Sequence, residues 1–180
     1  MKTFEISTEE MEYIIANHFG IRTNLIVPNV SWGLGIHECD LLICTKSGYC
    51  TEIEIKISAA DLKKDKEKQH GHNSDKIKYL YFAIPDYLNT EEIISHIPER
   101  AGILTIRNNG KRFVVLHERE PQRNVKATKL TTQEQYEMAR LGSLRIWGLK
   151  NKCTGYKKER KQLLNKIKEL ETKIKGIEEQ

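Results

Sequence analysis

Three charged residues interrupt two apolar stretches of the sequence, and their spacing would let them share one site. Asp40 opens the run DLLIC, and Glu54 and Lys56 lie within the run TEIEIKIS. Successive side chains of an extended strand point to opposite faces, so Glu54 and Lys56 would share a face. The Ser-Gly pair in the intervening KSGY predicts a hairpin turn, which would pair the two runs antiparallel and bring Asp40 near Glu54.

Two carboxylates and a lysine in this arrangement suit metal-assisted hydrolysis of a phosphodiester. Carboxylate oxygens are the ligands that Mg²⁺ prefers, and a site with one or two of them keeps positions open for water and a substrate phosphate. Mg²⁺, or Mn²⁺ as a substitute, would polarise the phosphate, while Lys56 would orient the nucleophile or offset developing charge. The alternative is a set of ordinary ion pairs on the solvent-facing side of a strand. Asp40 argues against that alternative, because aspartate is depleted in strands.

The order of these residues also resembles a known signature. Asp40, thirteen residues and then Glu54-Ile55-Lys56 resemble the D…(D/E)xK pattern of the PD-(D/E)xK nuclease superfamily. The following segments SAADLKKD, from Ser58, and YFAIP, from Tyr81, are similar to the branch typified by MmcB-like DNA-repair nucleases, so that the resemblance covers roughly residues 1–106.

The resemblance implies a Mg²⁺-dependent nuclease acting on DNA in repair, recombination or the processing of phage and mobile-element DNA. In that superfamily the Asp and Glu bind the metal, the residue between Glu and Lys adds a backbone carbonyl, and the Lys assists catalysis. These roles fall on Asp40, Glu54, Ile55 and Lys56.

Further acids are candidates for the same implied metal site. Members of the superfamily often add an acid from the first helix, a part that Glu12 or Glu10 could take, although acids in the first turns of a helix are expected from its dipole alone. Glu38 lies two residues before Asp40 on the same strand face, where it would supplement the site or border it. Cys39 replaces the proline that often precedes the aspartate.

The chain after Lys56 is rich in basic residues. It predicts a helix with Ser58 as its N-cap and a break near His70-Gly71-His72. Its candidate DNA contacts are Lys63, Lys64, Lys66 and His70. The alternative for the lysines is a solvated helix face. A metal pair of His70 and His72 is disfavoured, because one glycine separates them and magnesium prefers oxygen, so phosphate contact or loop structure is expected.

Composition indicates an ordinary globular protein with 38% hydrophobic and 31% charged residues. No apolar run approaches the roughly 20 residues of a membrane span, and the N-terminus lacks the apolar segment of a signal peptide, so we expect a cytoplasmic protein without membrane contact. The four cysteines have neither a C-x-x-C pair nor zinc-like spacing, so neither a disulfide scaffold nor a zinc site is indicated. Residues 150–180 hold ten Lys or Arg against five Glu, which accounts for the net charge of +5 and predicts local attraction to polyanions.

The order of predicted elements gives the fold class. Ser7-Thr8-Glu9-Glu10 predicts the cap of a first helix that ends at Gly20. A strand, a helix and a strand between Thr51 and Pro85 predict a parallel crossover beside the antiparallel hairpin. Further strands are expected at Asn24–Val27, Gly102–Ile106 and Phe113–Leu116, with a helix at TEEIISHI. We therefore expect an α/β fold with a mixed central sheet flanked by helices, the layout of the restriction-endonuclease-like core, plus a C-terminal coiled-coil tail.

The C-terminal third is expected to be helical. Thr131 offers an N-cap for a helix to about Leu149, which Gly142 weakens. A heptad seam follows, with spacings of four, three, four and three residues, at Leu163, Ile167, Leu170, Ile174 and Ile177. So short a coiled coil must pair with another chain or fold onto the body, and its Ile and Leu positions favour a parallel homodimer.

The sequence predicts three regions and leaves three classes of function open. Residues 1–120 would form the nuclease-like domain, residues 121–155 a helical extension and residues 156–180 the basic coiled-coil tail. The leading hypothesis is a metal-dependent DNA nuclease. The alternatives are a non-catalytic nucleic-acid-binding module with a nuclease-like fold, and an assembly protein that recruits a partner through the coiled coil.

Overall fold

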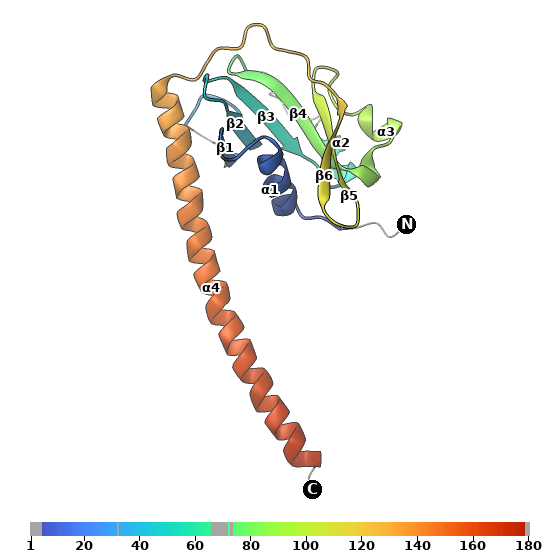
Figure 1. The fold of residues 1–180 in the computed structure, drawn as a ribbon, viewed down its shortest axis with the longest axis vertical. Coiled ribbons are helices and arrows are strands. Elements are labelled where there is room, and N and C mark those ends of the chain that lie inside the picture. Colours follow the sequence, from blue (N-terminus) through green and yellow to red (C-terminus); the bar gives the residue numbers. More distant parts are fainter. Residues whose placement is uncertain (1–4, 32, 66–71, 73, 179–180) are drawn as a thin grey trace. The chain divides into compact units, whose positions relative to one another are not determined.

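One six-stranded sheet organises the chain, and its strands follow one another across the sheet in the order of the sequence, β1 to β6 (Figure 1). The computed structural model describes residues 5–31, 33–65, 72 and 74–178. The strands are β1 (Leu25–Val30), β2 (Cys39–Cys44), β3 (Cys50–Ile55), β4 (Ile77–Pro85), β5 (Gly102–Asn108) and β6 (Phe113–Arg119).

The sheet is mixed, as the sequence predicted. The pairs β1–β2, β2–β3 and β5–β6 are antiparallel, and β3–β4 and β4–β5 are parallel. The turn between β2 and β3 closes with Gly48 at φ +88°, a conformation that glycine adopts at no steric cost. β3 is therefore the strand at which the antiparallel hairpin meets the parallel part of the sheet.

The helices α1, α2 and α4 begin at capping residues that the sequence indicated. Ser7 and Glu10 form a capping box at the start of α1, and the Ser58 hydroxyl accepts from the amide of Asp61 in α2. Thr90, the first residue of the predicted helix TEEIISHI, caps α3. Thr131 and Glu134 bond reciprocally at the start of α4. The helices are α1 (Thr8–His18), α2 (Ala59–Asp65), α3 (Glu91–Ile94) and α4 (Thr132–Glu178), and the short 3₁₀ helix η1 covers Asp86–Leu88.

Apolar side chains cover both faces of the sheet. On one face α1 packs through Met11 and Ile15 onto residues of β2 to β5. The other face carries two separate clusters. One joins β1, β2 and the first residues of β3 and β4 to Met138 and Leu141 of α4, and the other joins β4 and β5 to α2 and α3. Each cluster excludes water from its part of the face, and β3 from Glu52 onward runs between them.

α4 is a single helix of 47 residues where the sequence suggested two helical segments. Gly142, Gly148, Gly155 and Gly176 lie inside it, each at a cost of only about 1 kcal/mol relative to alanine. The chain divides into two compact units, residues 1–142 and 143–180, so the first unit extends past residue 120 to include the first turns of α4. Among the described residues, no helix has the length and apolar character needed to cross a membrane.

Gly102 offers a test of how tightly the sheet packs. It pairs with Tyr81, and a Cβ added at Gly102 would lie 2.5 Å from two carbons of the Tyr81 ring. We expect Gly102→Ala to lower the free energy of unfolding by about 1–3 kcal/mol, because the buried ring must move. Denaturant unfolding measures this loss. In a Tyr81→Leu background the same substitution should cost clearly less, and an equal cost in both backgrounds would contradict the proposed clash.

Candidate active site

Asp40 lies where the pairing of β2 with β3 ends. The last paired residues of the two strands are Leu41 and Ile53, so the amide of Ile55 is not used by β2. Oδ2 of Asp40 accepts a hydrogen bond from that amide at 2.7 Å. The predicted hairpin is confirmed, and it brings Asp40 to the segment that carries Glu54 and Lys56. The amide and the carbonyl of one strand residue point to the same edge, so the Ile55 carbonyl also faces the side of β2.

Glu54 and Lys56 form a buried ion pair on the face of the sheet opposite α1. Lys56 Nζ lies 2.9 Å from Glu54 Oε2, and the two side chains are 6% and 1% exposed. The Lys56 amide donates to the carbonyl of Ala83 in β4, which fixes the lysine just beyond the end of β3. This burial excludes the alternative of ion pairs on a solvent-facing strand. A charge pair this deep is costly to desolvate, so each partner depends on the other.

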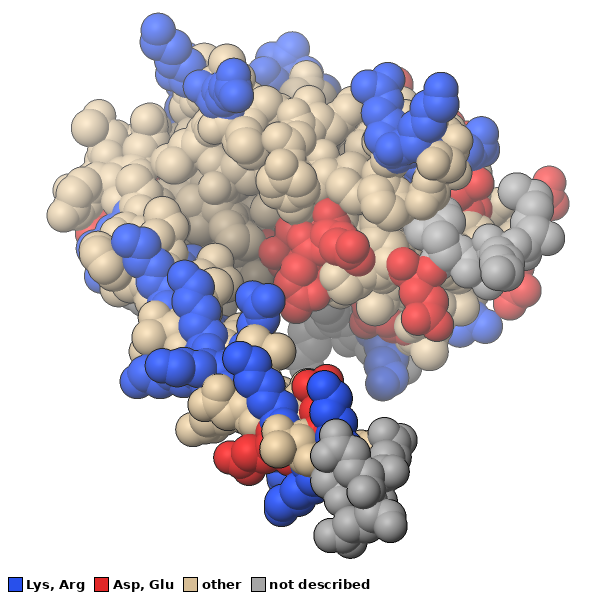
Figure 2. Space-filling model, turned by 60° about the horizontal axis from the view of Figure 1, so that its bottom comes forward, with Lys and Arg blue, Asp and Glu red and all other residues tan. Residues whose placement is uncertain are grey.

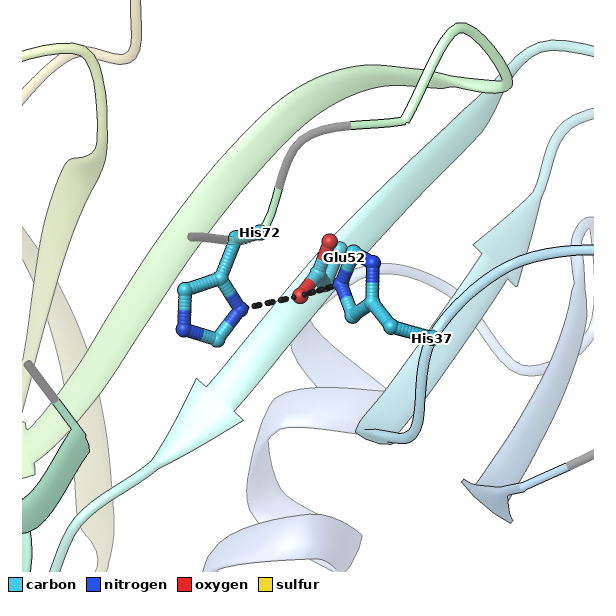
Figure 3. A group of neighbouring side chains, drawn as sticks. All are labelled: His37, Glu52 and His72. Carbon is cyan, nitrogen blue, oxygen red and sulfur yellow. Dashed lines mark hydrogen bonds and ion pairs between the residues drawn. The ribbon is translucent and has the colours of Figure 1, made fainter. Parts of the chain in front are cut away.

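Glu52 is the third charged residue on this side of β3, and it is fully buried. Its Oε1 lies 2.7 Å from Nε2 of His37 and 2.7 Å from Nδ1 of His72 (Figure 3). His37 belongs to the segment before β2, and His72 to the segment between α2 and β4. His72 Nδ1 is also 3.9 Å from Oε1 of Glu54, so the histidine cluster adjoins the Glu54–Lys56 pair.

The electrostatics of this region follow from burial and from these contacts. Burial raises the pKa of Glu52, but the hydrogen bonds from His37 and His72 and the charge that they carry when protonated outweigh it, and the pKa is lowered. The pKa of Cys39 is strongly raised, first by burial and then by the charges of Glu52 and Glu54. Cys39 is therefore a protonated thiol packed in the apolar cluster beside β2.

The three additional acids proposed for the metal site, Glu12, Glu10 and Glu38, lie in different surroundings. Glu12 on α1 accepts a hydrogen bond from Asn29 at 3.2 Å, and its pKa is raised mainly by burial and in part by the charge of Asp40. That influence places Glu12 in the neighbourhood of Asp40. Glu10 instead completes the capping box of α1, so it has a structural part. Glu38 is exposed at the border of the cluster.

The predicted DNA-contacting residues are exposed where the structure describes them. Lys63 and Lys64 lie in the last turn of α2, and Lys63 pairs with Glu92 of α3 at 3.3 Å. Lys66 and His70 lie outside the described residues.

Sequence reasoning missed the pairing of Glu52 with the two histidines. For His72 it expected phosphate contact or loop structure, but the side chain is 2% exposed and bonded to Glu52. Glu52 shares its strand face with Glu54, which was the available signal for its burial. Nothing in the local sequence around His37 or His72 indicates that they meet.

Comparisons with known proteins bear on the fold alone. No family model matches the chain, and no curated protein matches it. A solved structure, the SPO1766 protein of unknown function from Silicibacter pomeroyi, is similar with a TM-score of 0.55 and 15% identity. The similarity covers 79% of this chain and 88% of that one. The α/β arrangement thus recurs in another protein.

The raised pKa of Glu12 predicts a pH-dependent effect on stability. A raised pKa means that the fold favours the protonated carboxyl over the ionised one. The stability that the protonated carboxyl contributes is complete below the unfolded pKa and is lost as pH rises through the folded pKa. Glu12→Gln removes the ionisation, and the variant should gain stability relative to wild type between pH 4 and pH 7. Denaturant unfolding at both pH values measures the gain.

Glu91→Gln is the matched control, in the first turn of α3 rather than of α1. A negative charge is favourable in that position, so its neutralisation should give no gain at pH 7. The interpretation of Glu12 fails if both variants respond to pH alike.

Proposed function

We propose that this protein is a metal-dependent nuclease that hydrolyses phosphodiester bonds in DNA, with a restriction-endonuclease-like core. The observation that carries the proposal is the meeting of Asp40, Glu54 and Lys56 at one end of β3. Asp40 is fixed by the Ile55 amide, and Lys56 is fixed by Glu54. An acid, an acid and a lysine held in this way would arrive at the reaction already oriented, so little reorganisation would be required.

The donor set fits a magnesium or manganese ion. Asp40 and Glu54 supply carboxylate oxygens, and the Ile55 carbonyl faces the side of Asp40, so the ligand chemistry is that of a hard cation. The amide of Ile55 engages one oxygen of Asp40, and Lys56 engages one oxygen of Glu54. When bound, such an ion supplies Lewis acidity toward a phosphate oxygen and lowers the pKa of a water.

Lys56 has a defined part in this proposal. Its ammonium is held among buried groups, where electrostatic interactions are stronger than in water. It would stabilise negative charge that develops on the phosphate or orient the attacking water. Glu54 keeps the ammonium in place through the 2.9 Å contact, and this contact also offsets the cost of its burial.

A second candidate function is a binding module that holds nucleic acid without cutting it. The low exposure of the Glu54 and Lys56 side chains, 1% and 6%, favours this candidate, because a substrate phosphate must reach them. Asp40, which is only partly buried, is the more accessible member of the group. A cleavage assay separates the two functions.

DNA is the proposed partner in both cases. Residues 150–180 carry ten Lys or Arg and five Glu, and the basic side chains recur along the C-terminal helix (Figure 2). Basic residues on one helix neutralise phosphates without reading sequence, so the affinity they provide should fall steeply with salt.

The same helix supports the proposal of a parallel homodimer. Its apolar seam is longer than the five positions first identified. It continues toward the N-terminus with the same alternation of four-residue and three-residue spacings. Ile146, Leu149, Leu163, Ile167, Leu170 and Ile174 are each about half exposed, and Cys153, Tyr156 and Arg160 occupy the intervening seam positions. In a parallel pair, Lys166 would face Glu171 of the second copy across the seam.

Cleavage of DNA tests the leading proposal. We expect wild type with Mg²⁺ or Mn²⁺ to cut at least one of single-stranded, duplex, flapped and branched DNA. Asp40→Ala and Lys56→Ala should lower the rate by about 10²-fold or more, because each removes a group that acts on the reacting phosphate. Asp61→Ala, an acid on α2 that the proposal does not use, is the control and should cut as wild type does.

The affinity of each variant for DNA is measured in parallel with cleavage. Lys56→Ala should keep its affinity for DNA, and circular dichroism should verify that it folds. An active Lys56→Ala protein would remove the proposed mechanism. If wild type is inactive on all four substrates but binds them in a salt-sensitive way, the non-catalytic module is correct.

Oligomeric state tests the dimer. Deletion of residues 156–180 should halve the mass by light scattering and weaken DNA binding. Leu170→Lys should also give a monomer, because it places a charge in the seam, whereas Thr172→Lys adds the same charge outside the seam and should leave the dimer intact. A mass unchanged by the deletion and by Leu170→Lys would contradict the proposed interface.

Cys153 reports the orientation of the two helices. It is exposed, while the other cysteines are buried, and it lies in the seam. In a parallel pair in register, two copies of Cys153 face each other, so mild oxidation should give a covalent dimer that Cys153→Ser abolishes. A wild-type dimer that does not cross-link would exclude the parallel register.

A further inference from the structure

His37, Glu52 and His72 form a compact group of metal-ligating side chains that the proposed nuclease reaction does not use. Their nearest donor atoms all lie within 4.8 Å of one another. The three residues come from separate segments, the chain before β2, the centre of β3 and the chain between α2 and β4 (Figure 3). Both histidines direct a ring nitrogen to the same oxygen of Glu52. Two imidazole nitrogens and one carboxylate thus converge on one point.

Hydrogen bonds alone do not satisfy this group. Among the described residues, Oε2 of Glu52 has no hydrogen-bond partner although it is buried. A buried polar atom without a partner costs about 1–3 kcal/mol, and more when the group is charged. Such an atom in a fully buried carboxylate is a reason to expect a ligand that the side chains themselves do not supply.

The surroundings hold His72 in the position that this convergence requires. His72 adopts φ +57°, an uncommon conformation for a residue other than glycine, and its carbonyl accepts from Arg100. Its ring packs edge-on against Phe82 at 5.5 Å between centroids and against His37 at 5.4 Å. The imidazole is therefore fixed by contacts on several sides, as a preorganised ligand would be.

We propose that His37, Glu52 and His72 bind a divalent transition-metal cation of the zinc class. Imidazole suits zinc and its neighbours in the first transition row, whereas magnesium prefers a set made only of oxygens. Two histidines and one glutamate, with a fourth position for water, are an established ligand set for zinc. The ring nitrogens that now face Glu52 must carry lone pairs to bind, so each imidazole would hold its proton on the other nitrogen. Ligand bonds of about 2.0–2.1 Å need a small rotation of the three side chains to admit the ion.

This site uses none of the residues assigned to the proposed nuclease reaction, although it adjoins them. His72 Nδ1 lies 3.9 Å from Oε1 of Glu54. A cation bound here would join β3 to two segments that hydrogen bonds between strands do not hold. Binding should therefore stabilise the fold.

Metal titration of the full chain without nucleic acid tests the proposal. After treatment with a chelator, the protein is titrated with Zn²⁺ by calorimetry and with Co²⁺, whose visible spectrum reports nitrogen and oxygen ligation. We expect the His37, Glu52 and His72 site to bind one ion per chain and the thermal unfolding midpoint to rise. His37→Gln and His72→Gln should each weaken binding by at least tenfold and lose most of that rise.

Two further variants assign the binding to this site. His18→Gln is the control among histidines, because His18 faces His117 at 2.9 Å elsewhere in the fold, and it should bind as wild type does. Asp40→Asn should also retain binding, which separates this result from the fate of the nuclease proposal. Failure of folded wild type to bind Zn²⁺ and Co²⁺ would overturn the proposal. Binding that survives both His37→Gln and His72→Gln, or that is lost in Asp40→Asn alone, would overturn it equally.

Discussion

Glu52, Glu54 and Lys56 place three ionisable groups on one side of a strand from which water is excluded. An isolated ion in such surroundings costs several kcal/mol or more, so each group needs a partner within hydrogen-bonding distance. Lys56 forms an ion pair with Glu54, and the two histidines contact Glu52. These requirements bring the chain before β2 and the chain after α2 onto β3. The sheet and the two outer segments are thus tied together by the need to compensate buried charge.

The apolar clusters explain why that charge is buried at all. On the face opposite α1, one cluster covers β1, β2 and the starts of β3 and β4, and the other covers the rest of β4 and β5. The part of β3 from Glu52 onward lies between them, and its polar side chains fill the gap that two separate clusters leave. A continuous apolar layer would pack as well without any ion pair, so the charged strip contributes specificity or chemistry more than stability.

The sequence predicted those features that depend on neighbouring residues. Ser7 with Glu10 and Thr131 with Glu134 marked two helix starts, and the Ser-Gly turn paired β2 with β3 and brought Asp40 to Glu54. The cluster of His37 and His72 was not predictable in this way, because the two residues lie 35 positions apart and meet only through Glu52. The continuity of α4 was also missed, since its four glycines weaken a helix without ending it when the other residues favour the helix.

The strands have the same order in the sheet as in the chain, and this order affects how the sheet can form during folding. Each strand pairs with the strand next in sequence, so the sheet can grow by adding one strand at a time. The longest connection between paired strands is residues 56–76, which separate β3 from β4. Closing that connection is the costliest entropic step of the sheet. His72 lies within it, so closing the crossover also brings one of the two histidine partners to Glu52. The step that joins β3 to β4 thereby supplies part of the compensation that this buried carboxylate needs.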